Sequence, residues 1–155
     1  MRRKDLEITD RAEIDRILEK ALVCRLGLSV DGEPYVVPLA FGYDGKSLYF
    51  HSAREGRKID MMRANPRVCF EVDMDHEVVR REDSCAWTIK YSSVIGFGKA
   101  AMIEEGEAKA AALNVLMRHY GGEEYAVGEK MLDTLAVIRV DIESVTGRTR
   151  YDRKR

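Results

Sequence analysis

Residue types that could bind an anion gather between a predicted strand and a predicted helix. Arg57 and Lys58 fall in the first turn of the helix predicted over residues 57–64. That end of a helix carries free N–H groups and a partial positive charge, so two cations there oppose the helix dipole. A phosphate held by the N–H groups, these cations and the Ser52 hydroxyl would remove the conflict.

The pattern of charges also has a simpler interpretation. Both cations could be solvated side chains on a surface turn, with Asp60 offsetting part of their charge. A helix of two turns has only a weak dipole, so the residues alone leave both interpretations open. His51 directly precedes Ser52, and histidine ordinarily changes charge near neutral pH. Its place beside the anion site makes His51 a candidate proton donor.

The elements that must position these residues are predicted to be short strands joined by tight turns. Asp-Gly turns at 31–32 and 44–45 separate strands over 23–30, 33–43 and 46–51, which predicts an antiparallel meander. Pro38 cannot donate to a strand ladder, which favours an edge, a bulge or a strand end. The interrupted edge could offer backbone groups to a flat ligand, or Pro38 could only protect the edge from aggregation.

The rest of the chain supplies helices and longer strands. A helix is predicted over 10–21 with Asp10 as its cap, and a second over 104–120. The second helix has a candidate buried stripe that ends at its last turn: Ala108, Ala112, Val115, Leu116 and the helix-end residue His119. A polar loop is predicted over 73–85, a polar connector over 123–133, and strands over 86–101 and 135–142. In the strand over 86–101, Trp87 and Ser93 share a side with Phe97, which suits a barrel core or a dimer seam. Trp87 could stack on a ligand or simply pack. One domain is expected over 1–147, and the basic segment 148–155 is expected to be disordered.

Bulk properties exclude several classes of protein. The chain has 155 residues and a formal net charge of -1, which argues against nucleic-acid binding through a strongly basic surface. No apolar run approaches the roughly 20 residues of a membrane span, and residues 1–10 lack the apolar core of a signal peptide. We therefore expect a cytoplasmic protein without a membrane partner. The three cysteines lack metal-ligand spacing, so no metal site is expected.

A family resemblance rests on the same stretch. The run His51-Ser52, Gly56-Arg57-Lys58 and Asn65-Pro66 resembles the flavin-phosphate segment of the pyridoxamine 5'-phosphate oxidase-like family, the FMN-binding split barrels. The layout over residues 8–146 is similar to the nitroimidazole-resistance branch, most specifically in HSAREGRKID and SVIGFGKA. The resemblance implies a mainly β, α+β fold: an antiparallel split β-barrel with flanking helices.

The resemblance also implies a cofactor site shared by two subunits. FMN would lie at a homodimer interface, with its phosphate on Arg57 and Lys58 and Ser52 assisting. The isoalloxazine ring would lie against the strand residues Val36, Val37, Pro38 and Leu39 and beside His51. Ser93 matches a position that touches FMN, and Trp87 or its neighbours could reach the site from the partner chain.

The favoured function is therefore an FMN-dependent oxidoreductase, with NAD(P)H as a candidate donor and a small planar acceptor, which the branch implies to be nitroaromatic. A non-enzymatic flavin or haem carrier, or a sensor, stays open as an alternative. Pyridoxamine phosphate oxidation itself fits less well. The oxidases carry a serine where this chain has Gly56, and residues 146–155 do not match their C-terminal segment with Trp and Arg.

Overall fold

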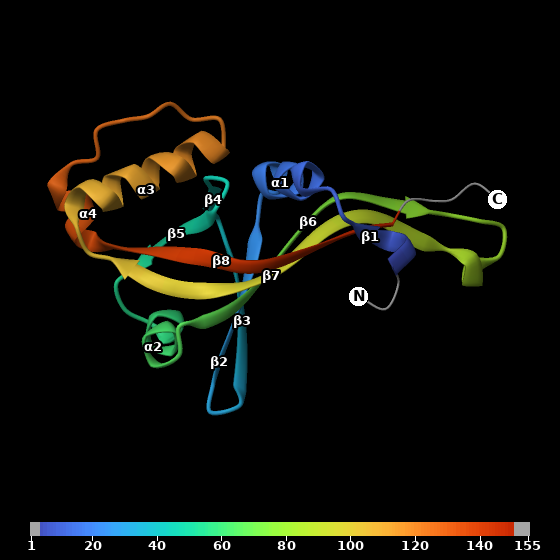
Figure 1. Cartoon of the computed structure of the whole chain (residues 1–155), viewed down its shortest axis with the longest axis horizontal. Coiled ribbons are helices and arrows are strands. Elements are labelled where there is room, and N and C mark those ends of the chain that lie inside the picture. Colours follow the sequence, from blue (N-terminus) through green and yellow to red (C-terminus); the bar gives the residue numbers. More distant parts are fainter. Residues whose placement is uncertain (1–3, 151–155) are drawn as a thin grey trace.

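The computed structural model describes residues 4–150, which form one antiparallel sheet with flanking helices (Figure 1). The eight-stranded sheet has the order β3-β2-β6-β7-β8-β5-β4, and β1 pairs with β8. The predicted mainly β, antiparallel architecture is confirmed. The elements are η1 (Lys4–Leu6), β1 (Glu7–Ile8), α1 (Arg11–Lys20), β2 (Cys24–Val30), β3 (Glu33–Leu39), β4 (Gly42–Tyr43), β5 (Ser47–Ala53), α2 (Arg57–Ala64), β6 (Arg67–Val79), η2 (Ser84–Ala86), β7 (Thr88–Ile103), α3 (Gly106–His119), α4 (Glu129–Thr134) and β8 (Leu135–Arg150).

The sequence predicted the helices best. The Asp10 carboxylate accepts the Ala12 N–H at 3.0 Å and caps α1, as expected. Helix α2 spans the predicted residues and ends at Asn65, before Pro66. In α3 the buried stripe is only partly as expected: Ala112 and Leu116 are buried, but Lys109 and Leu113 complete the stripe.

The meander predicted over residues 23–51 is confirmed at both Asp-Gly turns, which join β2 to β3 and β4 to β5, but its middle strand is not continuous. The strand expected over 33–43 divides at Ala40 and Phe41, so that β3 pairs with β2 while β4 pairs with β5. Phe41 is fully buried, and its N–H donates to the Tyr120 hydroxyl at 3.0 Å, which turns the chain into the core. Strand β3 ends the sheet order, so the edge position, one of those expected for Pro38, is confirmed.

The polar loop expected over 73–85 is mostly strand. Strand β6 continues to Val79 and pairs with β7, and together they project from the body of the molecule (Figure 1). Val78 lies opposite Ile89, and Lys90 Nζ lies 3.0 Å from the Glu77 carboxylate. We call residues 75–91 the arm. Its charged residues resemble a loop in sequence, but cross-strand pairing with β7 keeps them extended.

Strand β8 is longer than predicted. It runs for 16 residues and pairs with β1, β5 and β7, so the segment 148–150 of the expected disordered tail lies in the sheet. Residues 151–155 lie outside the described residues. The polar connector expected over 123–133 contains most of α4, which begins at Glu129. None of the helices described over residues 4–150 is long and apolar enough to cross a membrane.

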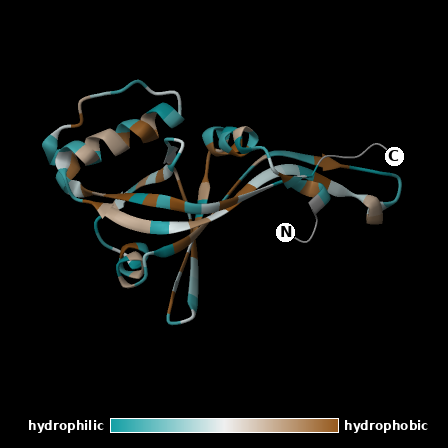
Figure 2. Ribbon diagram, viewed as in Figure 1, coloured by the Kyte–Doolittle hydropathy of each residue, from teal (hydrophilic) through white to brown (hydrophobic). Residues whose placement is uncertain are grey.

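The two faces of the sheet are covered unequally. The inner face and α1 enclose the main core, which includes Phe50, Phe70 and Ile138. Helix α3 packs on one end of the outer face, over Val137. Beyond α3, Ile95 and Phe97 of β7 are 44% and 48% exposed, so the side that holds them is not barrel core. Figure 2 shows the resulting mixture of apolar and polar positions along the sheet.

Candidate ligand-binding site

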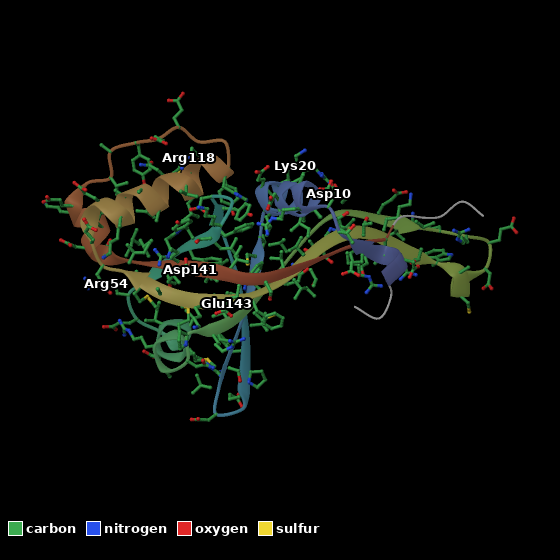
Figure 3. The ribbon with its side chains drawn as sticks, in the orientation of Figure 1. Asp10, Lys20, Arg54, Arg118, Asp141 and Glu143 are labelled. Atoms are coloured by element: carbon green, nitrogen blue, oxygen red, sulfur yellow. The ribbon has the colours of Figure 1, made fainter. Side chains whose placement is uncertain are left out.

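The residues predicted to bind an anion lie where β5 ends and α2 begins. Strand β5 pairs with β8 as far as Ala53 opposite Leu135. In the turn that follows, the Arg54 guanidinium donates to the Asp133 carbonyl at 2.7 Å, and Arg54 lies on the lower side of the sheet in Figure 3. This hydrogen bond holds the turn against the end of α4. We call residues 51–58 the β5–α2 segment.

The first turn of α2 has no side-chain cap. Gly56 occupies the N-cap position at φ 124°, a conformation that residues with a Cβ rarely adopt. Glycine therefore suits this position, and it cannot cap the N–H groups of the first turn with a side chain. The start of α2 thus keeps backbone donors for an anion, next to Arg57 and the half-buried Lys58.

Arg57 connects α2 to the edge strand β3. Its Nη2 lies 3.3 Å from a Glu33 carboxylate oxygen, and its guanidinium lies 4.8 Å from the centre of the Tyr35 ring. All three side chains reach the surface, and an exposed ion pair contributes about 0.2–1 kcal/mol. Such a pair is weak enough to exchange for a phosphate, which accepts stronger charge-assisted hydrogen bonds.

Ser52 supplies a test of whether an anion fits here. Its side chain is buried, and its hydroxyl has no hydrogen-bond partner among the described residues. Leaving a buried hydroxyl unpaired costs about 1–3 kcal/mol, so such groups usually have a partner or a ligand. The orphaned hydroxyl fits the phosphate role that the sequence predicted.

His51 borders a cavity at the opposite end of β3 from Arg57. The cavity has a volume of about 410 Å³ and is lined by Ala40, which follows β3, and by residues from α3 to the start of β8. Strand β3 therefore runs from Glu33, beside Arg57, towards this cavity. Along it Val36 and Pro38 are exposed, whereas Val37 and Leu39 are half-buried against the core. Only the exposed pair is free to contact a flat ligand on the outer side.

Trp87 and Ser93 lie elsewhere. Trp87 sits at the tip of the arm, where its indole N–H donates to the Arg81 carbonyl at 2.9 Å. Figure 1 shows the arm and α2 at opposite ends of the molecule. Ser93 lines a second cavity, of about 340 Å³, on the outer face of the sheet. One chain therefore does not bring these two residues to Arg57.

Sequence reasoning missed the acidic network beside Ser93. Arg25 Nη1 lies 3.0 Å from the Glu71 carboxylate and 2.8 Å from that of Asp73, and His76 lies 3.1 Å from Asp73. Burial and the nearby Asp73 raise the pKa of Glu71. Burial also opposes ionisation of Asp73, but hydrogen bonds from Arg25 and His76 outweigh it and lower its pKa. The members come from two strands, so no local motif marks them.

Other candidate residues have structural roles. The His119 imidazole lies 2.8 Å from the Ala21 carbonyl and packs on the Phe41 ring at 4.4 Å between centres, as expected for a helix-end residue. Burial raises the pKa of the Cys24 thiol to about 12. A thiol with that pKa stays protonated, so Cys24 is a packing residue rather than a nucleophile.

Comparison with known proteins assigns the fold to a family. Residues 10–149 match the family described as pyridoxamine 5'-phosphate oxidase. The chain belongs to the pyridoxamine 5'-phosphate oxidase family. A solved structure of a candidate 5-nitroimidazole antibiotic resistance protein from Bacteroides thetaiotaomicron is 33% identical with a TM-score of 0.83, over 93% of this chain and 86% of that one.

Two other solved structures with this fold are of proteins that bind FAD, or FAD and haem. An FAD-binding protein from Mesorhizobium loti is 29% identical with a TM-score of 0.68, covering 92% of this chain and 96% of that one. An FAD and haem binding protein from Mycobacterium smegmatis, 20% identical with a TM-score of 0.79 over 92% and 72% of the two chains, shares the fold. A curated Rhizobium meliloti protein of unassigned function, RA0666, is 33% identical over 67 residues, so the match spans less than half of that relative, 44%.

Proposed function

We propose that this chain is a flavoprotein that binds FMN, with the flavin phosphate at the start of α2. The observation that carries the proposal is the uncapped first turn of α2, with Arg57 and Lys58 in it and the unpartnered, buried Ser52 hydroxyl shortly before it. Backbone N–H groups, two cations and a hydroxyl together make a site that suits a phosphate.

The exposed side of β3 is the proposed place for the flavin ring. This strand is a sheet edge, with Val36 and Pro38 exposed, and it links Arg57 to the cavity beside His51. Bound flavin supplies two-electron redox chemistry, with NAD(P)H as the proposed donor and a small planar compound, such as a nitroaromatic one, as the proposed acceptor. The His51 imidazole borders the cavity, where it could donate a proton to that acceptor.

A homodimer is the proposed assembly. The arm carries Trp87 away from α2 within its own chain, so Trp87 could reach a flavin only on a second copy. The outer face of the sheet exposes Ile95 and Phe97 of β7, and Val36 on β3 is 63% exposed. Exposed apolar side chains of this kind favour burial against a partner. The flavin would then lie at the interface, with Ser93 contributing from the sheet.

Visible absorption of the purified protein tests the cofactor. We expect a flavin spectrum that survives desalting and is lost in Arg57→Ala/Lys58→Ala. Arg63→Ala is the matched control, because Arg63 is a cation in the last turn of the same helix and should leave binding unchanged. A colourless protein that does not take up added FMN would refute the proposal.

Release of the cofactor by heat, followed by chromatography, separates FMN from FAD, which the Mesorhizobium loti relative binds. Turnover with NAD(P)H and nitrobenzene then separates an oxidoreductase from a carrier that only binds flavin. His51→Ala tests the proton donor, because an enzyme that keeps bound FMN and full turnover would exclude that role.

A further inference from the structure

The cavity beside His51 is lined mainly by apolar side chains. We call it the α3 cavity; Leu113, Leu116 and Met117 of α3 and Tyr125 and Met131 of the segment before β8 form most of its wall. Its volume of about 410 Å³ falls within the range of about 300–1,000 Å³ that is usual for small-molecule sites. The cavity is therefore large enough for an aromatic ring with a substituent.

The wall of the α3 cavity offers no fixed charge. Among the residues described by the structure, none that lines the cavity is a lysine, arginine, aspartate or glutamate, and His51 is the one basic group in its wall. Its hydroxyls are also engaged. The Tyr120 hydroxyl donates to the Leu22 carbonyl at 2.8 Å, and the Tyr125 hydroxyl lies 3.8 Å from the Met131 sulfur. An anion that entered the cavity would lose its hydrating water and find few groups to replace those hydrogen bonds, so its binding would be unfavourable.

The mouth of the cavity is adaptable. Met131 is 47% exposed, and Met117 and Tyr125 are also exposed apolar side chains at the cavity. Methionine has flexible torsions and a polarizable sulfur, so it fits ligands of different shapes. Covering these side chains with an apolar ligand removes them from water, which favours binding.

We propose that the α3 cavity selects the acceptor: it binds uncharged aromatic compounds with apolar substituents and rejects those with a carboxylate or phosphate. The inference rests on the proposed function, which places the flavin ring along β3 beside His51. It narrows the acceptor class and separates this chain from enzymes that recognise a phosphorylated substrate through cations.

A pair of matched probes tests this selectivity. Nitrobenzene and 4-nitrobenzoate share a nitro-substituted ring and differ by one carboxylate. Their dissociation constants for the purified full-length chain can be measured by ligand-observed NMR, without turnover. We expect nitrobenzene to bind at least about tenfold more tightly, because the carboxylate meets no cation in the cavity.

Met131→Lys places a cation at the cavity mouth, on a side chain exposed enough for the fold to tolerate the change. We expect it to narrow or reverse the preference by tightening 4-nitrobenzoate. Leu22→Lys is the matched control: Leu22 is 69% exposed, does not line the cavity, and should leave the preference unchanged.

The inference is overturned if the parent chain binds 4-nitrobenzoate as tightly as nitrobenzene or more tightly, or if Met131→Lys leaves both affinities unchanged. It is also overturned if Met131→Lys changes only the oligomeric state of the protein. The last result would mean that a second copy covers the cavity. Binding is read without flavin turnover, so the two proposals can fail separately. A chain that takes up no FMN but discriminates the probes refutes only the function, whereas a chain that binds FMN without discriminating refutes only the inference.

Discussion

The β5–α2 segment and the arm carry candidate site residues in opposite ways. In the β5–α2 segment, His51, Ser52, Arg57 and Lys58 follow one another along the chain over one strand end, one turn and one helix start, although His51 borders the α3 cavity rather than the start of α2. The arm carries Trp87 at its tip, far from that segment in the same molecule (Figure 1). The difference indicates that a motif of neighbouring residues describes a local site, whereas the residues of the arm would reach that site only in the proposed dimer.

Shortening the arm should weaken flavin binding more than a single substitution in the site. Met74 and Ser92 lie opposite each other, so an Asn-Gly turn can replace residues 75–91 between them. The main core includes no residue of the arm, so the shortened chain should fold. If the arm serves a partner's site, the dissociation constant for FMN should rise at least about tenfold, as loss of several interface contacts costs more than about 1.4 kcal/mol. Fluorescence titration measures it.

Mixing two variants that each lack one part of the proposed site tests whether the arm of one chain completes the site of the other. Arg57→Ala/Lys58→Ala keeps the arm, and the shortened chain keeps the cations. In a mixed dimer one site would receive both parts and the other neither. Random pairing of equal amounts makes about half of the dimers mixed, so we expect binding to recover to about one flavin per four chains. No recovery on mixing, with each chain folded by circular dichroism, would mean that the arm does not complete the partner's site.

Ser52→Ala should raise the stability of the flavin-free chain and lower its affinity for FMN. Removing an unpaired buried hydroxyl should raise the free energy of unfolding of the flavin-free chain by about 1 kcal/mol. The same change removes a phosphate donor and should weaken FMN binding by about tenfold, or 1.4 kcal/mol. Urea unfolding and flavin titration measure the two effects. Lower stability without flavin would show that the hydroxyl has a partner in the protein.

Trp87→Ala should have a smaller effect than removal of the arm. Stacking of an aromatic side chain contributes about 0.5–1.5 kcal/mol beyond its buried area, so FMN binding should weaken by about two- to tenfold. Leu22→Ala is a control for loss of an exposed apolar side chain that lies outside both the arm and the proposed interface. It should leave the flavin fluorescence of the bound state unchanged, whereas Trp87→Ala should increase it by removing a quencher.

Glu33→Gln should have the smallest effect on FMN affinity, and it should raise that affinity rather than lower it. It removes the carboxylate that pairs with Arg57 and so competes with a phosphate. An exposed pair is worth about 0.2–1 kcal/mol, so FMN should bind up to about fivefold more tightly. Titrations at low and high salt can show this, because the gain should shrink as salt screens the pair. A loss of affinity would mean that Glu33 positions Arg57 for the ligand.

Features of the fold that depend on neighbouring residues could be predicted from local sequence patterns. The α2 boundaries and the Asp10 cap follow from neighbouring residues, and Pro38 marked its strand as a candidate edge. The division of the second strand at Phe41 could not be predicted in this way, because it depends on a hydrogen bond to Tyr120, far along the chain. Tertiary contacts override strand propensity at that point.

The site shows the same limit. The strand end and helix start that carry Ser52 and Arg57 were predicted from one stretch of sequence. The α3 cavity next to His51 is lined largely by residues within 113–135, which no motif connects to it. The acidic network of Arg25, Glu71 and Asp73 likewise needs the pairing of β2 with β6. Pairing between distant strands is set by the whole sheet rather than by a window of sequence.

The position of β8 also determines when the protein can acquire its fold during synthesis. This strand follows every strand it pairs with, and it lies between β7 and β5 in the sheet. Until the ribosome has released residues 135–150, β5 has only the short β4 beside it, and the β5–α2 segment lacks support on one side. Contacts so distant in sequence form slowly. Flavin uptake at the proposed site should therefore begin only after residues 135–150 have been synthesised and β8 has paired with β5.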